Sequence, residues 1–418
     1  MKKIMLVVAN FVLSWAVLSG TVYAQNVVTD WAAIVQPPLN TPAKIPAIQM
    51  VLRAMVQIAV YDSVVAIEGG YQPFAAAITA LPGADVRAAV ATAAYLTARS
   101  RVALAQLPAL DTTYQTYLAT IPAGQSRDDG VRVGEAAANA VATLRANDGM
   151  ANILVYSCSD DPAPAGEFEP DGGCNTQPAG ANVGQIRPFT FGNPARFRPD
   201  GPDPLTSNAY IEDFIETRDF GRSVGSLRSP EQTDIAYFWQ AVDTHRGLTD
   251  LAVSRGLDIR DTARFLAMVY TAAADANIAG YEAKYFYRSW RPRTAIPRAD
   301  TDRNADTDAD PTWTPLLSVN HPEYPSAHSY STTAITDTIG RFFRTNKVMW
   351  TLTASRSAFP QMVQTERTYH DLNALMREVY DARVWAGLHW RHSMMHGAQI
   401  GRKVADYVSD RFFRPVEQ

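Results

Sequence analysis

The sequence predicts a mainly α-helical protein built of helical bundles. Apolar residues recur at helical spacing over long segments, alanine is dense on several of these faces, and strand-type alternation is rare. The 418 residues are 47% hydrophobic and 19% charged, which suits a large globular core and is too polar for a multi-span membrane protein. The net charge of -4 argues against a nucleic-acid partner, which needs a basic face.

The first 24 residues have the pattern of a cleaved signal peptide. Two lysines follow the initial Met, residues 4–19 are mostly apolar, and a small-x-small cleavage site ends at Ala24. An uncleaved membrane anchor is the alternative, but the apolar run is short and is interrupted by Asn10 and Ser14. We expect a periplasmic or secreted protein without a stable membrane anchor after cleavage.

Residues 25–156 are predicted to form an N-terminal helical region. The Gly69-Gly70 pair ends its first helix, and Asp128 and Asp129 at the start of its last helix suit the helix dipole. Alanine-rich faces allow these helices to pack closely as a bundle. We expect helices at residues 44–67, 84–105, 109–120 and 128–146.

Residues 157–208 are predicted to be a loop-rich connection, because Pro, Gly, Asp and Asn dominate there. This segment contains Cys158 and Cys174, which favour a disulfide in an oxidising compartment. A metal site is the alternative, although it needs more thiols or nearby histidines, and a nucleophilic cysteine is a third.

Residues 209–418 are predicted to form a C-terminal helical domain. Ser229 and Pro230 make a helix start, with Ser as N-cap and Pro at the first helical position. The expected helices span residues 208–222, 229–245, 258–289, 329–345, 360–380 and about 390–410.

A polar loop interrupts this domain at residues 300–312. Its alternating acids, Asp306, Asp308 and Asp310, resemble the start of a calcium loop. Pro311 stands where such a loop needs Gly, and no Glu closes it, so the sequence favours a solvated loop over a calcium site.

Two basic clusters in this domain suit an oxyanion site. Lys284 and Arg291 are two helical turns apart among aromatic residues, and the alternative is a solvated pair at a helix end. The Pro-Ser-Ala-His segment ending at His328 precedes a helix, so its backbone N–H groups and the Ser326 hydroxyl can cradle an anion. His328 can exchange a proton there, and the alternative is an ordinary N-cap with an incidental histidine.

A third cluster pairs Arg383 with His389, and two more histidines follow. His392 and His396 have the i, i+4 spacing of a metal-chelating pair, and the alternative is that they are surface or packing histidines.

The order and spacing of the three clusters resemble a known superfamily. Lys284 is followed after six residues by Arg291-Pro292, then comes Pro325-Ser326-Ala327-His328, and then Arg383 with His389 after five residues. This pattern resembles the vanadium-dependent haloperoxidases and type-2 phosphatidic acid phosphatases, and the surrounding sequence over 187–410 is similar to the bacterial haloperoxidases. The resemblance implies a vanadate site, which phosphate also fits, in the core of the C-terminal bundle.

The resemblance also implies a role for each residue. His389 is the axial ligand to the metal, His328 is the acid–base group, and Lys284 polarises bound hydrogen peroxide. Halide is then oxidised to hypohalous acid through a peroxovanadate bound to His389, and a small organic acceptor is halogenated. The vanadate oxygens are held by Lys284, Arg291, Ser326, the backbone N–H of Ala327, and Arg383.

One position hints at the halide, and two depart from the family pattern. His321 matches the bromide-type members, so we expect bromide or iodide oxidation rather than chloride oxidation. Ala327 replaces the usual Gly, which costs energy if that residue needs positive φ. Ser393 replaces the usual acid four residues after His389, so the carboxylate that orients the imidazole is either missing or supplied from elsewhere, with Asp275 and Asp371 as candidates.

Two other functions remain open. A phosphomonoesterase can use the same pocket, with His389 as the nucleophile that forms a phosphohistidine and His328 protonating the leaving group. An exported anion-binding protein with decayed catalysis is the third reading, suggested by Ala327 and Ser393. A homo-oligomer is left open.

Overall fold

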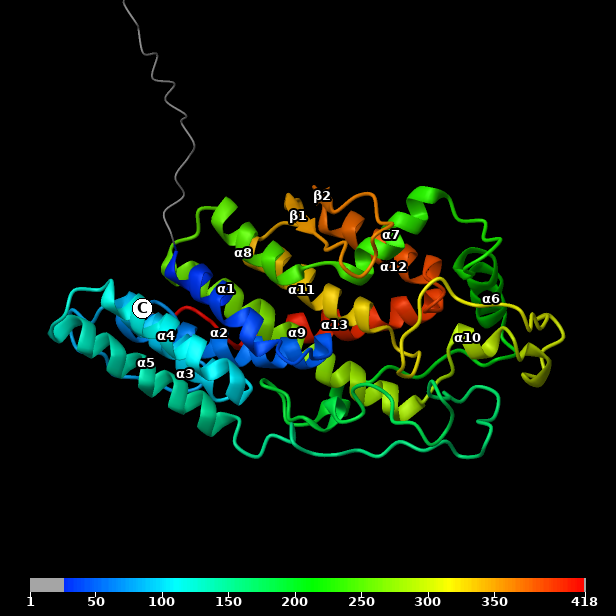
Figure 1. The fold of residues 1–418 in the computed structure, drawn as a ribbon, viewed down its shortest axis with the longest axis horizontal. Helices are drawn as coiled ribbons and strands as arrows, with labels where there is room; N and C mark the ends of the chain where they lie inside the picture. Colours follow the sequence, from blue (N-terminus) through cyan, green and yellow to red (C-terminus); the bar gives the residue numbers. More distant parts are fainter. Residues whose placement is uncertain (1–25, 417–418) are drawn as a thin grey trace, which may run out of the picture.

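The computed structural model describes residues 26–416 as an elongated assembly of helices (Figure 1). The predicted mainly α class is confirmed, whereas the predicted signal peptide at residues 1–24 lies outside the described residues. The N-terminal helices are α1 (Val27–Leu39), α2 (Pro46–Glu68), α3 (Val86–Arg99), η1 (Leu104–Gln106), α4 (Leu107–Ala119) and α5 (Gln125–Leu144). The following elements are η2 (Val183–Gln185), η3 (Pro194–Phe197), α6 (Asn208–Gly221), α7 (Pro230–Ala241), α8 (Thr244–Ser254), α9 (Ile259–Tyr287), α10 (Pro292–Ala295), η4 (Ala299–Thr301), α11 (Ala327–Phe343), β1 (Trp350–Thr353), β2 (Glu366–Tyr369), α12 (Leu372–Trp385) and α13 (Arg391–Arg411).

Two of the predicted helices are wrong in extent. The segment 229–245 is broken after Ala241, because Asp243 accepts a hydrogen bond from the Arg246 backbone N (3.0 Å) and caps a new helix, α8. The segment 360–380 is helical only from Leu372, where α12 starts, because residues 360–365 are irregular and β2 pairs antiparallel with β1. The sequence analysis also did not predict α1.

Helix α9 lies at the centre of the molecule and is buried along most of its 29 residues. It packs against α2 from the N-terminal region and against α11 and α13 from the C-terminal region. Apolar side chains from both regions form one continuous core cluster around it. The division into residues 25–156, 157–208 and 209–418 stays a prediction.

Helix α2, with 23 residues, is long and apolar enough to cross a membrane. It lies inside the protein, since 89% of its apolar window is buried. Its composition therefore reflects packing against α9 in the core.

The two predicted loops have the expected irregular structure. The predicted connection at 157–208 contains only the short helices η2 and η3 before α6 begins at Asn208, and it runs along one side of the molecule (Figure 1). A disulfide joins Cys158 and Cys174, with their Cα atoms 5.3 Å apart. In the 300–312 loop, Asp306 and Asp308 are exposed and Asp310 forms an ion pair with Arg222 (3.2 Å).

Candidate active site

The three basic clusters come together at the ends of four helices. Lys284 lies in the last turn of α9, Arg291 caps α10, Ser326 caps α11, and Arg383 lies near the end of α12. His389 follows α12 in the short connection to α13, where Gly387 has φ +71° and turns the chain. All the side chains of this group except Gly387, which has none, are buried.

Lys284 and Arg291 are held by backbone carbonyl groups of the segment that precedes α11. Lys284 Nζ donates to the carbonyls of Pro322 and Glu323, both at 2.8 Å. Arg291 donates from Nε to the His321 carbonyl (2.7 Å) and from Nη1 to the Leu388 carbonyl (2.6 Å). These bonds fix the position of both cations without neutralising their charges.

His321 contacts Arg291 through its ring. Arg291 Nη2 lies 3.0 Å from His321 Nδ1, and a guanidinium can only donate, so Nδ1 is the accepting nitrogen and Nε2 carries the proton. The nearby Pro322 carbonyl, 3.2 Å from the same Nδ1, is therefore not its hydrogen-bond partner. The imidazole also packs against the Tyr281 ring, with centroids 5.7 Å apart.

Helix α7 positions two of the site residues, and the sequence analysis did not assign it this function. Arg383 Nη1 donates to Gln240 Oε1 at 2.9 Å. His328 Nε2 lies 3.0 Å from the Trp239 carbonyl. Because a carbonyl only accepts, Nε2 of His328 carries the proton and Nδ1 is left with a free lone pair. His328 is thus set up as a proton acceptor.

Glu323 is a site residue that the sequence analysis missed. Its Oε1 lies 2.7 Å from His389 Nδ1, and the same oxygen accepts from the Trp390 backbone N at 3.2 Å. The carboxylate fixes the tautomer with the proton on Nδ1, so Nε2 of His389 is the free ring nitrogen.

The expectation that Asp275 or Asp371 would orient His389 is wrong. Asp275 accepts from the backbone N of Phe189 (2.6 Å) and Thr190 (3.0 Å), and Asp371 caps α12. The signal that marks Glu323 in the sequence is its place between His321 and Ser326, within a predicted site segment.

Ser326 and Ala327 form the predicted cradle at the start of α11. Ser326 is buried, it is the N-cap residue, and its Oγ has no hydrogen-bond partner among the described residues. Ala327 is the first residue of the helix, and it is absent from the residues with positive φ. The Cβ of Ala327 therefore causes no backbone strain. Its backbone N–H lies in the first turn of the helix, where N–H groups have no partner within the helix and can bind an anion.

The site has more buried positive charge than negative charge. Burial lowers the pKa of Lys284 well below its usual value, that of Arg291 to about 10 and that of Arg383 to about 9. Burial raises the pKa of Glu323 to about 7, against the lowering effect of Lys284 and Arg291. One carboxylate faces three cations, so the charge balance calls for an anion.

The three site imidazoles are neutral near pH 7. Burial lowers the pKa of His321, His328 and His389 well below the usual value, and the nearby cations lower it further. Neutral His389 has a lone pair available on Nε2, and neutral His328 has one on Nδ1. The two residues can therefore act as a ligand or nucleophile and as a base.

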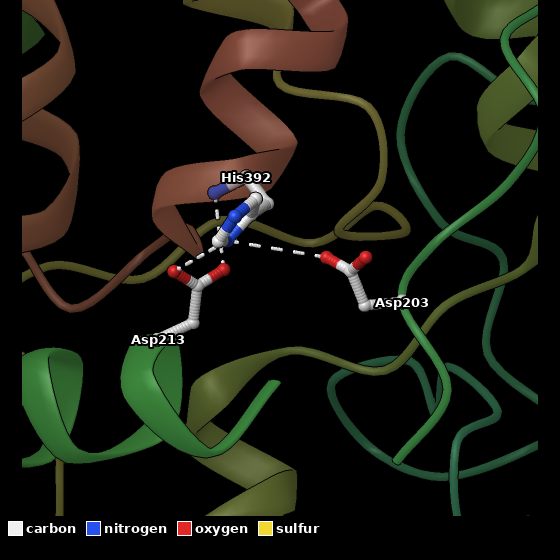
Figure 2. Close-up of side chains that lie close together, drawn as sticks. All are labelled: Asp203, Asp213 and His392. Carbon is white, nitrogen blue, oxygen red and sulfur yellow. Dashed lines mark hydrogen bonds and ion pairs between the residues drawn. The ribbon is translucent and has the colours of Figure 1, made fainter. Parts of the chain in front are cut away.

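His392 and His396 lie outside this group and do not chelate together. His396 Nδ1 is 2.9 Å from the Tyr324 hydroxyl. His392 Nδ1 is 3.0 Å from Asp213 Oδ1 and 4.0 Å from Asp203 Oδ2, between the two carboxylates (Figure 2).

Comparison with known proteins agrees with this geometry. Residues 264–418 match the family model of the VCPO second helical-bundle domain. This range contains all three basic clusters. The C-terminal part is a VCPO-type helical bundle. The resemblance to the vanadium haloperoxidase family is thereby confirmed, whereas no curated protein matches the chain in sequence.

The vanadium haloperoxidase fold extends over nearly the whole chain. A bacterial vanadium-dependent iodoperoxidase superposes with a TM-score of 0.76 at 20% identity, covering 94% of this chain and 96% of its own. A bacterial vanadium-dependent chloroperoxidase superposes with a TM-score of 0.69 in both forms. The apo form is 15% identical and the holo form 16%, each covers 87% of this chain, and 92% and 91% of their own chains are covered.

The residues of this site fit a vanadate ion. Vanadate is a tetrahedral oxyanion, and Arg383 Nε and Ser326 Oγ are buried donors without a partner among the described residues. The excess of buried cations requires negative charge, and His389 Nε2 is a free nitrogen donor. Phosphate has the same shape and charge and fits the same donors.

Proposed function

We propose that this protein is a vanadium-dependent haloperoxidase that uses hydrogen peroxide to oxidise a halide to hypohalous acid. The observation that carries the proposal is the buried set of three cations, which face only one carboxylate and two neutral imidazoles with free nitrogens. The haloperoxidase fold and the match of residues 264–418 support it.

In this proposal Lys284, Arg291, Arg383, Ser326 and the Ala327 N–H hold vanadate, and His389 Nε2 binds the metal. When bound, vanadate supplies a Lewis-acid centre that makes hydrogen peroxide electrophilic toward halide. Lys284 and the two arginines stabilise negative charge on the oxygens, because they are fixed in a site of low dielectric constant. Glu323 holds the His389 ring in place, and His328 Nδ1 accepts a proton from the incoming peroxide.

We further propose bromide or iodide as the halide and a small organic molecule as the acceptor of the hypohalous acid. His321 supports this choice, because its ring lies beside Arg291 at the edge of the site and is only half-buried. The iodoperoxidase among the similar structures agrees with a softer halide. We also propose export directed by residues 1–24, which N-terminal sequencing of the mature protein tests.

The alternative function is hydrolysis of phosphomonoesters in the same pocket. The Glu323–His389 pair favours it, since a carboxylate that holds the Nδ1 proton leaves Nε2 free to attack phosphorus. The decayed anion-binding protein is the weaker candidate. The two departures that suggested it are accounted for, because Ala327 has helical geometry and Glu323 supplies the carboxylate.

A single assay series separates these functions. Purified protein is supplied with vanadate, hydrogen peroxide and each halide, and bromination or iodination of a phenolic dye is followed beside hydrolysis of p-nitrophenyl phosphate without vanadate. We expect halogenation that depends on vanadate and is lost in His389→Ala. Hydrolysis that vanadate inhibits, with no halogenation, contradicts the proposal and favours the phosphatase.

A further inference from the structure

A cavity lies beside Glu323 and is lined by neither His389 nor the three cations of the anion site. It has a volume of about 330 Å³ and is bounded by α6, the segment 202–205, the chain after α9 and the start of α13. Glu323 binds His389 through Oε1, whereas Oε2 is buried without a partner among the described residues. The three basic residues of the anion site, Lys284, Arg291 and Arg383, do not line this cavity.

Buried polar side chains belong to the lining of this cavity. Four further lining residues bury a hydrogen-bonding atom that has no partner among the described residues. Each of these residues is more than nine-tenths buried. Ser393 lies within hydrogen-bonding reach of Glu323, and Trp290 within reach of Tyr210, so these buried atoms give the cavity a polar surrounding without themselves requiring a ligand. The four residues are Tyr210, Ser289, Trp290 and Ser393.

The walls of the cavity are aromatic. Tyr210 and Trp390 meet edge to face, with ring centroids 5.5 Å apart, and Trp290 and Tyr324 complete the aromatic lining. The remaining lining residues are mostly small or apolar. Aromatic faces carry partial negative charge and attract organic cations.

The charged groups of the cavity are all acidic. Asp203, Asp213 and Glu323 line it, and its lining residues include neither Lys nor Arg. The basic group closest to the two aspartates is His392, beside Asp213 (Figure 2). A divalent cation bound by His392 and the two aspartates would not involve Glu323 or the aromatic walls.

We propose that this cavity binds a small organic ammonium ion. The aromatic walls receive the alkyl groups and the positive charge, and the carboxylates of the lining supply the opposite charge. This inference does not depend on the proposed peroxidase activity.

The cavity and the anion site are coupled through Glu323. Lys284 and Arg291, on the far side of Glu323, oppose a cation in the cavity while the anion site is empty. An oxyanion bound at these residues cancels their charge. Phosphate and the ammonium ion should therefore strengthen each other's binding, by at least about fivefold.

Calorimetric titration with choline tests the proposal, and the neutral isostere 3,3-dimethyl-1-butanol is the matched ligand control. We expect saturable binding of choline and at least about tenfold weaker binding of the alcohol. Tyr210→Leu should weaken choline binding about tenfold, whereas Tyr210→Phe should retain it because the ring remains. Asp213→Asn should weaken binding, whereas Asp219→Asn, on the same helix but outside the cavity, should not.

Several outcomes overturn the proposal. Equal binding of choline and the alcohol shows an apolar pocket without charge selection. Choline binding that is unchanged in Tyr210→Leu and Asp213→Asn places the cation elsewhere. Zinc binding lost in Asp213→Asn, without choline binding, assigns the outer carboxylates to a metal. Phosphate titration of the same protein reports on the anion site separately, so failure of one site is distinguished from failure of the other.

Discussion

Replacing Glu323 with Gln should change the affinities for phosphate and vanadate by different factors. Glutamine keeps an oxygen that can accept from His389 Nδ1, which now lies 2.7 Å from Glu323 Oε1, but it removes the negative charge. Phosphate binds through the cations alone, so it gains from that removal. Vanadate affinity should rise for the same reason, but it should also fall because His389 Nε2 becomes a weaker electron donor to the metal without the carboxylate.

The expected size follows from the geometry. The carboxylate lies 2.7 Å from one ring nitrogen, and an anion bound at the opposite nitrogen is about 8 Å from it. At about pH 8, above the Glu323 pKa of about 7, and at an effective dielectric constant of about 20, one unit of charge at that distance contributes about 2 kcal/mol. Phosphate should therefore bind at least about tenfold more tightly. Loss of a carboxylate partner weakens metal binding by a histidine about 10- to 100-fold. The ratio of vanadate affinity to phosphate affinity should therefore decrease by that factor.

Calorimetry with each anion measures both constants on the same preparation. Glu282→Gln is the matched control, because Glu282 lies on α9 near Lys284 but pairs with Arg198 outside the site. Its two affinities should stay as in the wild type. If Glu323→Gln changes phosphate and vanadate affinity by the same factor, the carboxylate does not act through the imidazole and the reasoning is refuted.

Three other predictions concern the scaffold. Gly397→Ala should weaken phosphate binding about tenfold, because its Cβ would come within 2.8 Å of the Ser326 carbonyl. Gly401→Ala is the control: its Cβ meets the Tyr330 carbonyl one turn away, so it should cost similar stability, about 1–3 kcal/mol by thermal unfolding, and leave phosphate affinity nearly unchanged. Equal losses of phosphate affinity in the two variants contradict this prediction. Burial lowers the pKa of His245 to about 3, so the neutral imidazole contributes to stability above about pH 6.5 and this contribution is lost as the pH falls. Between pH 7 and 5 the wild type should lose about 2 kcal/mol more unfolding free energy than His245→Asn in denaturant titrations. Parallel pH profiles of the two proteins refute this prediction. The double variant Cys158→Ser, Cys174→Ser should lose about 3 kcal/mol in guanidinium unfolding, since the bridge closes a separation of 16 residues, and an unchanged midpoint contradicts a stabilising bridge.

The sequence predicted most helices because their apolar periodicity and caps are local signals. Ser229 and Asp258, for example, cap α7 and α9 where the residue types indicate. The hairpin at residues 350–369 was missed because two strands of four residues carry too little alternation to outweigh the neighbouring helical pattern. The residues of the three basic clusters were found through their spacing within short motifs.

The partners of those residues could not be predicted in the same way. Glu323 is 66 residues from His389, and Gln240 is 143 residues from Arg383. No local pattern links such pairs, because only the packing of α7 against α12 and the turn at Gly387 bring them together. Because the true partner of His389 is far away in sequence, the sequence suggested Asp275 and Asp371 instead, and these accept hydrogen bonds from backbone groups elsewhere.

The position of the carboxylate explains why the cavity and the imidazole share one residue. The usual acidic side chain four residues after the ligand histidine is Ser393 here, which is short and lines the cavity. Glu323 approaches the imidazole from the chain before α11 instead, so Oε1 reaches His389 and Oε2 faces the space beside Ser393. A carboxylate with one oxygen on each side transmits charge between the two sites. Substituting Ser393 by Asp should therefore fill part of the cavity and weaken the coupling, while Glu323 keeps its bond to His389.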